Sequence, residues 1–91
     1  MNIIDNAAQN RFEVGIENHL AFIEYRRTGN VLSLTHAAVP RELEGRGIGS
    51  QMVRGTLDLI RGRDEKVIPA CSFVDAFIRR HADYQDLLAD R

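Results

Sequence analysis

The sequence of 91 residues contains one cysteine and no long apolar run. A single cysteine excludes a disulfide bond within the chain, and no cysteine and histidine residues have the spacing of a metal site. The missing apolar run and the missing leader segment exclude a membrane span and a secretion signal, so we expect a cytoplasmic protein with no membrane contact and no metal. The 12 basic and 13 acidic residues give a net charge of −1, which argues against a broad nucleic-acid-binding surface.

Two common phosphate-binding motifs are also missing. No Gly-Lys-Ser or Gly-Lys-Thr is present, which excludes the nucleoside-triphosphate P-loop, and the glycines at positions 45, 47 and 49 lack the Gly-x-Gly-x-x-Gly spacing of dinucleotide folds. The composition is that of an ordinary globular domain, with 44% hydrophobic and 27% charged residues. A chain of this length builds one core, so we predict a single domain over residues 1–91. A ligand would have to bind to this domain, because there is no room for a separate substrate domain.

Residues 44–50 are the most informative stretch, because three glycines stand at alternate positions. Glycine adopts positive φ and has no Cβ, so backbone N–H groups can converge on an anion that lies against the chain. Apolar residues then recur at helical spacing up to Gly62, so the loop opens a helix whose N-terminus also favours negative charge. The alternative is a plain glycine-rich turn before a surface helix. The predicted phosphate-binding residues are Gly45, Arg46, Gly47, Ile48, Gly49 and Ser50.

Alternating apolar and polar residues predict strands over 11–16, 19–27 and 31–39, which form an antiparallel three-stranded meander. Residues 1–10 have no periodicity and are assigned to a lead-in. A short apolar run at 66–71 predicts a fourth strand, parallel to the third through a β-α-β crossover. On the third strand, the alternation places four side chains on one face: Leu32, Leu34, His36 and Ala38.

A second helix is predicted to begin at Ser72, which together with Asp75 resembles a capping box. We expect His81 to cap the other end of this helix, where positive charge is favoured. Phe73 and Phe77 are one helical turn apart, and we predict that both pack onto the sheet. Their predicted partners there are Phe12, Leu34 and Ile68.

This order of elements, with a glycine loop opening the crossover helix, resembles the GNAT superfamily of acetyl-coenzyme A-dependent N-acetyltransferases. The superfamily's pyrophosphate motif is Gln/Arg-x-x-Gly-x-Gly/Ala, in which Gly47 and Gly49 take the glycine positions and Glu44 stands where Gln or Arg is usual. Four segments look like the small YjdJ-like branch of that superfamily: HAAVP at 36–40, GRGIG at 45–49, CSFV at 71–74 and RHADY at 80–84. The resemblance implies a minimal α+β fold of this type, lacking the helices that shape the acceptor site in larger relatives.

The resemblance also implies a cofactor and its position. Acetyl-coenzyme A would donate the acetyl group, with its diphosphate at the glycine loop and its pantetheine arm between the third and fourth strands, where these separate. Cys71 would lie near the acetyl group and His81 near the cofactor's end of the fold. Alanines stand at 37 and 38, where Thr and Glu are expected, so no carboxylate role is carried over there. The backbone expected to hydrogen-bond the pantetheine and the acetyl carbonyl is that of Ala37, Ala38 and Val39.

Two side chains are candidate catalytic residues. His36 is the candidate general base, because histidine changes its protonation state close to neutral pH, and its alternative is a structural role. Cys71 is a candidate nucleophile that forms an acetyl-cysteine, a candidate proton donor in direct transfer, or a packing group. We favour direct transfer in a ternary complex, which is the general mode of the superfamily.

The leading hypothesis is therefore an acetyl-CoA-dependent N-acetyltransferase that acts on a small amine or a lysine side chain. A second hypothesis is a coenzyme A-binding module without efficient turnover, and a third is an α+β scaffold that binds no coenzyme A. The residues identify neither the acceptor nor the oligomeric state.

Overall fold

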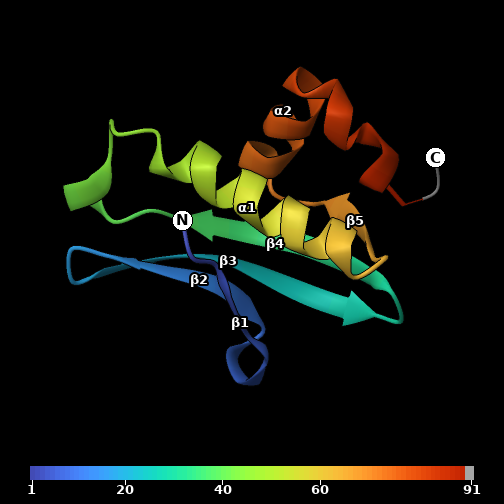
Figure 1. The fold of residues 1–91 in the computed structure, drawn as a ribbon, viewed down its shortest axis with the longest axis horizontal. Coiled ribbons are helices and arrows are strands. Elements are labelled where there is room, and N and C mark those ends of the chain that lie inside the picture. Colours follow the sequence, from blue (N-terminus) through green and yellow to red (C-terminus); the bar gives the residue numbers. More distant parts are fainter. Residues whose placement is uncertain (90–91) are drawn as a thin grey trace.

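The computed structural model describes residues 1–89, which form a five-stranded sheet with two α-helices packed on one of its faces (Figure 1). The strands lie in sequence order, with β1 to β4 antiparallel and β5 parallel to β4. No element among these residues covers the opposite face, which we call the open face. The elements are β1 (Ile4–Asn6), η1 (Ala7–Gln9), β2 (Arg11–Ile16), β3 (His19–Thr28), β4 (Val31–Ala38), η2 (Arg41–Leu43), α1 (Ile48–Gly62), β5 (Lys66–Pro69), α2 (Ser72–Arg80) and η3 (Ala82–Leu87).

The predicted α+β fold class is confirmed, including the meander and the parallel crossover strand. Glu17 and Asn18 join β2 to β3 with φ values of 51° and 66°, the left-handed pair that a two-residue hairpin turn requires. The crossover helix α1 ends at Gly62 as expected. The left-handed residue after it is Asp64, with φ of 57°, so Gly62 itself is helical and does not supply the turn.

The assignment of residues 1–10 to a lead-in was wrong, because this segment contributes a strand. β1 pairs with β2 at the edge of the sheet, and the meander therefore has four strands. The Asp5 carboxylate accepts hydrogen bonds from the Tyr25 hydroxyl and from Arg63, each 2.7 Å long, and the Ile3 side chain packs where a Cβ on Gly55 of α1 would stand. These contacts hold a polar strand that has no periodic apolar pattern of its own.

A β-bulge at Thr35 changes the predicted faces of β4. Tyr25 opposes Leu34 whereas Glu24 opposes His36, so Thr35 has no partner on β3, and its hydroxyl instead donates to the Glu24 carbonyl at 3.3 Å. Up to Leu34 the alternation holds, and Leu32 and Leu34 are buried under the helices. Beyond the bulge the faces exchange: the side chain of His36 lies on the open face. Ala38 follows His36 there, while Ala37 faces the helices, opposite buried Ile23.

The core lies between the sheet and the helices, and it includes only part of the predicted packing. Phe77 is 1% exposed and shares the core with Phe12 and Leu34, as predicted. Phe73 is 41% exposed and Ile68 is 44% exposed, so neither belongs to it. Ile68 pairs with Ser33, and both therefore lie on the open face, whereas the neighbouring Val67 points into the core.

The start of α2 also differs from the prediction. Cys71 is the N-cap residue, and no side chain provides a capping hydrogen bond. Ser72 is already the first helical residue, and the Asp75 carboxylate accepts a hydrogen bond from Arg79 at 2.8 Å. The capping-box prediction was therefore wrong by one position, because a serine inside the first turn is not placed to accept from the third helical N–H.

Candidate active site

The glycine loop has the backbone geometry that its sequence predicts. Gly45 and Gly47 have φ values of 81° and 72°, in the left-handed region that residues with a Cβ rarely adopt. Gly47 is the N-cap of α1, and no acidic residue lies in the first turn of that helix. The loop therefore presents the unpaired amides and the positive dipole end of a 15-residue helix to the surface, which is the arrangement that binds anions.

Gly49 is in close contact with a side chain from another element. An added Cβ would stand 2.9 Å from the tip of the Phe73 ring. Phe73 is at the start of α2, and it lies beside the glycine loop instead of entering the core. The helical spacing of Phe73 and Phe77 predicts a shared core face, so the position of Phe73 beside the loop could not be predicted from this pattern.

Two adjoining cavities lie along the loop and along the end of β4. The cavity at the loop has a volume of about 260 Å³, and the cavity at β4 has a volume of about 390 Å³. Val39, Glu44 and Phe73 line both of them, so the two cavities adjoin, and we call them together the groove. The first is lined in addition by Leu43, Gly45, Gly47, Ile48, Gly49 and Ser50, and the second by His36, Ala37, Ala38 and Met52.

The groove lies where β4 and β5 separate. Their parallel pairing ends at Leu34 and Pro69, and the Cys71 N–H makes a last hydrogen bond to the Leu34 carbonyl at 2.8 Å. β4 continues to Ala38 with β3 as its partner on the other side. On the side of the groove, residues 36–38 of β4 have no strand partner within residues 1–89, so this edge can bind an extended ligand by its backbone.

The structure does not bring the two candidate catalytic residues together. Cys71 is half-buried at the point where the strands separate, and it packs against the core. His36 is exposed on the open face, where its ring makes an edge contact with Phe22 at 6.3 Å between centroids. No hydrogen bond joins these two side chains anywhere in the described part of the chain. His36 lines the groove, whereas Cys71 is not among its lining residues.

His81 has the helix-capping position that the sequence predicts. It is the C-cap of α2, its ring stacks on Phe77 at 4.0 Å between centroids, and its Nδ1 lies 2.7 Å from the Phe77 carbonyl. Because a carbonyl only accepts, Nδ1 must carry the hydrogen. His81 does not line the groove, so its contact with a cofactor stays a prediction.

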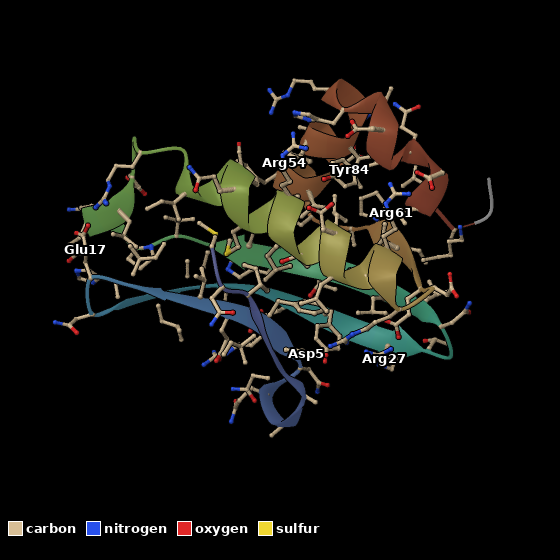
Figure 2. All side chains as sticks on the ribbon, viewed as in Figure 1. Asp5, Glu17, Arg27, Arg54, Arg61 and Tyr84 are labelled. Carbon is tan, nitrogen blue, oxygen red and sulfur yellow. The ribbon has the colours of Figure 1, made fainter. Side chains whose placement is uncertain are left out.

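The charges around the loop are of both signs. Arg46 donates two hydrogen bonds to the carboxylate of Glu17, which Figure 2 labels at the turn between β2 and β3. Its guanidinium is thereby directed at the hairpin. Glu44 lines the whole groove, and no cationic side chain among residues 1–89 pairs with it. Close to an anion this carboxylate is repulsive, whereas close to a cationic amine it is attractive.

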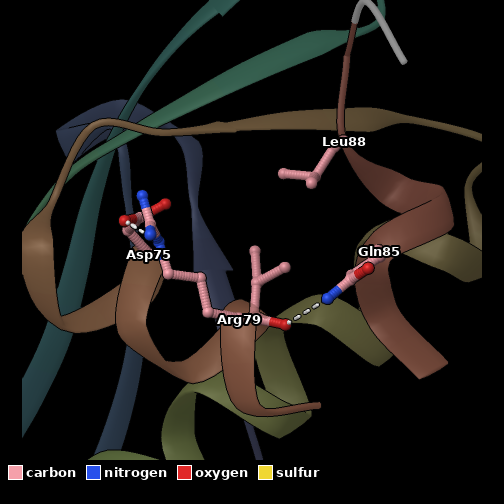
Figure 3. A pocket seen from close by; sticks show the side chains of 5 residues that line it. Asp75, Arg79, Gln85 and Leu88 are labelled. Carbon is pink, nitrogen blue, oxygen red and sulfur yellow. Dashed lines mark hydrogen bonds and ion pairs between the residues drawn. The ribbon is translucent and has the colours of Figure 1, made fainter. Parts of the chain in front are cut away.

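A further cavity of about 460 Å³ lies apart from these residues, between α2 and the segment that follows it (Figure 3). Asp75 and Arg79 form an ion pair at its wall, and the Gln85 amide donates to the Ile78 carbonyl at 3.4 Å. No predicted site residue lines it. Within residues 1–89, no three histidine, cysteine, aspartate or glutamate side chains lie together as a metal site requires.

Comparisons with known proteins agree with this geometry. The sequence model of a family described as GCN5-related N-acetyl-transferase matches residues 11–87. The chain is also similar to a GCN5-like candidate N-acetyltransferase from Staphylococcus aureus, solved by NMR. The two are 30% identical with a TM-score of 0.72, over 96% of this chain and 86% of the other. No curated protein gave a significant match. None of the helices formed by residues 1–89 has the length and apolar character needed to cross a membrane.

Proposed function

Because the chain belongs to the GCN5-related N-acetyltransferase family, we propose that its 91 residues act as one domain that transfers an acetyl group from acetyl-coenzyme A to an amine. One observation supports this most strongly. A single groove joins an anion-binding loop at a helix N-terminus to the unpaired backbone edge of β4. A diphosphate followed by an extended arm with amides of its own matches both parts of that groove.

The loop and the strand have separate roles in this proposal. The amides of Gly45, Gly47 and Gly49 and of the first turn of α1 hold the diphosphate, and the backbone of residues 37–39 hydrogen-bonds the pantetheine arm. This leaves the thioester near the point where β4 and β5 separate. Arg46 acts on the cofactor only indirectly, because Glu17 holds its guanidinium. We also propose the small YjdJ-like branch as the closest grouping, on the four segments that resemble it.

We propose direct transfer for the chemical step. The amine nitrogen forms a bond to the acetyl carbon, the C–S bond breaks, and the departing thiolate takes up one proton. His36 lines the groove and is the general base that removes the proton of the incoming ammonium. Cys71 is a proton donor or a packing group in this scheme. The absence of a hydrogen bond from Cys71 to a base in residues 1–89 supports direct transfer over an acetyl-cysteine intermediate.

Calorimetric titration with acetyl-CoA, followed by assays of thiol release over a panel of amines and peptides, tests the proposal. We expect binding, and release of coenzyme A above the hydrolytic background with at least one amine. Binding without acceleration by any amine would favour the alternative, a coenzyme A-binding module without efficient turnover. Absence of binding would refute both.

A further inference from the structure

The groove connects the two faces of the sheet. Met52 comes from α1 and Phe73 from α2, so both line the groove from the helix side. His36 lines the same cavity, but the bulge at Thr35 places its side chain on the open face. A ligand seated at the glycine loop and a second molecule on the open face can therefore meet beside the end of β4.

The open face beside His36 carries two ordered rows of side chains. Arg11, Glu24 and His36 oppose one another across β2, β3 and β4. In the next row, Phe22 lies between Glu13 and Ala38. The Phe22 ring connects the rows, because its centroid is 4.8 Å from the Arg11 guanidinium carbon and 6.3 Å from the His36 ring centroid.

One carboxylate in these rows is free to bind a cation. Arg11 forms an ion pair with Glu13, which also accepts a hydrogen bond from Asn6. The hydrogen bond from Arg11 lowers the pKa of Glu13, so that pair is charged and mutually satisfied at neutral pH. Glu24 has no ion-pair partner in the part of the chain that the structure describes. It lies directly opposite His36, next to the aromatic ring of Phe22.

Exposed hydrophobic side chains also lie on the open face around these rows. Three large hydrophobic side chains lie on the open face with high exposure: Ile4 at 56%, Leu20 at 41% and Ile68 at 44%. They come from β1, β3 and β5, so they span the sheet from edge to edge. A small amine at Glu24 would leave all three in water, whereas the surface of a protein would cover them.

From these observations we propose that the open face docks a protein and presents one of its lysine side chains to Glu24 and Phe22, beside His36. This inference rests on the proposed acetyl transfer. Glu24 attracts the ε-ammonium and Phe22 packs against the alkyl stem. The ammonium gives one proton to His36, its nitrogen forms the bond to the acetyl carbon, and the breaking C–S bond yields a thiolate that takes the nitrogen's next proton.

NMR titration tests the docking without any turnover. The probes are a short peptide with one lysine between leucines and the same peptide with norleucine, which lacks only the ammonium. We expect the lysine peptide to shift the amide signals of Phe22, Glu24 and His36, and the norleucine peptide to bind about tenfold more weakly. Glu24→Gln should weaken the lysine peptide to a similar extent. The matched control is Glu42→Gln, because Glu42 lies in η2, outside the sheet, and this change should have no effect.

Kinetics then separate this inference from the proposed function. With acetyl-CoA bound, we expect Glu24→Gln to raise KM for the lysine peptide about tenfold while calorimetry shows an unchanged Kd for acetyl-CoA. We also expect kcat/KM for the peptide to exceed that for 1,5-diaminopentane, which supplies the ammonium without a flanking surface. The docking proposal would be overturned by equal kcat/KM values for the two amines or by an unchanged KM in Glu24→Gln. It would also be overturned if the peptide shifted only amide signals of α1. The proposed function fails separately, through loss of acetyl-CoA binding or of all acetyl transfer.

Discussion

The carboxylate of Glu17, in the turn between β2 and β3, holds the guanidinium of Arg46, in the glycine loop, through hydrogen bonds of 3.0 and 2.6 Å. The hydrogen bond from Arg46 lowers the pKa of Glu17, and the carboxylate in turn raises the pKa of Arg46. The pair is therefore charged at neutral pH. It joins the loop to a hairpin that is distant in sequence, and the guanidinium is directed at the hairpin.

For this reason we expect Arg46→Ala to weaken acetyl-CoA binding by less than about fivefold, because an exposed ion pair contributes little by itself. Glu17→Gln should leave the affinity unchanged or increase it, since it frees the guanidinium to turn toward the diphosphate. Calorimetry on both variants measures these effects. A loss of about a hundredfold in Arg46→Ala would mean that the guanidinium binds the cofactor directly.

The same pair makes stability depend on pH in a defined direction. The folded-state pKa of Glu17 lies below its ordinary value of 4.5, so its stabilising contribution is complete above that value and is lost as the pH falls through the lower folded-state pKa. We expect wild type to melt at a higher temperature than Glu17→Gln at neutral pH, and the difference to shrink in acid. Melting curves of both proteins across the acid range provide the measurement. If the difference in melting temperature between the two proteins grew as the pH fell, the predicted direction of the pH dependence would be wrong.

Gly47→Val should abolish acetyl-CoA binding. Position 47 has a φ of 72°, which strains a β-branched residue, and the lost loop geometry removes several charge-assisted hydrogen bonds of about 1.5–3 kcal/mol each. Gly62→Ala is the control, because Gly62 is helical and a Cβ there meets open space. Calorimetry should show no binding for the first variant and normal binding for the second. A folded Gly47→Val protein with near-native affinity would refute the proposed site.

Phe77 and Phe73 provide a matched pair of truncations on one helix. Phe77→Ala removes a ring that is 1% exposed and should cost about 3–5 kcal/mol, which is much of the stability of a domain of this size. Phe73→Ala removes a ring that is 41% exposed and should cost less than about 1.5 kcal/mol, while changing acetyl-CoA binding in the groove that it lines. Denaturant unfolding separates the two. Equal costs would contradict the placement of Phe73 outside the core.

Intact-protein mass spectrometry after incubation with acetyl-CoA alone tests the role of Cys71. Direct transfer predicts no acetylated enzyme, and a Cys71→Ala defect in kcat of no more than about tenfold, because a helix N-cap without a side-chain hydrogen bond tolerates alanine. His36→Gln should reduce kcat more strongly. A stoichiometric adduct that disappears in Cys71→Ala, and that an added amine consumes, would instead establish an acetyl-cysteine intermediate.

The parts of the site that depend on local backbone chemistry could be predicted from the sequence. Three glycines at alternate positions, followed by apolar residues at helical spacing, predict the left-handed residues of the loop and the start of α1. Both features depend only on the residue types at those positions. Other features depend on contacts across the fold. β1 is held by the hydrogen bonds that Tyr25 and Arg63 donate to the Asp5 carboxylate, and no apolar periodicity in residues 1–10 indicates these contacts. Phe73 follows the helical pattern of Phe77, yet α2 begins so close to the loop that its first turn contacts Gly49.

The bulge at Thr35 marks a position where β4 can lose one residue in evolution without a change of partners. Thr35 is the one residue of this segment without a partner on β3, so deletion of its codon would restore regular alternation through β4. The imidazole of His36 would stay on the open face opposite Glu24, because His36 would then directly follow Leu34, and adjacent residues of a strand point to opposite faces. An in-frame deletion at position 35 would thus make the ladder regular without burying this histidine.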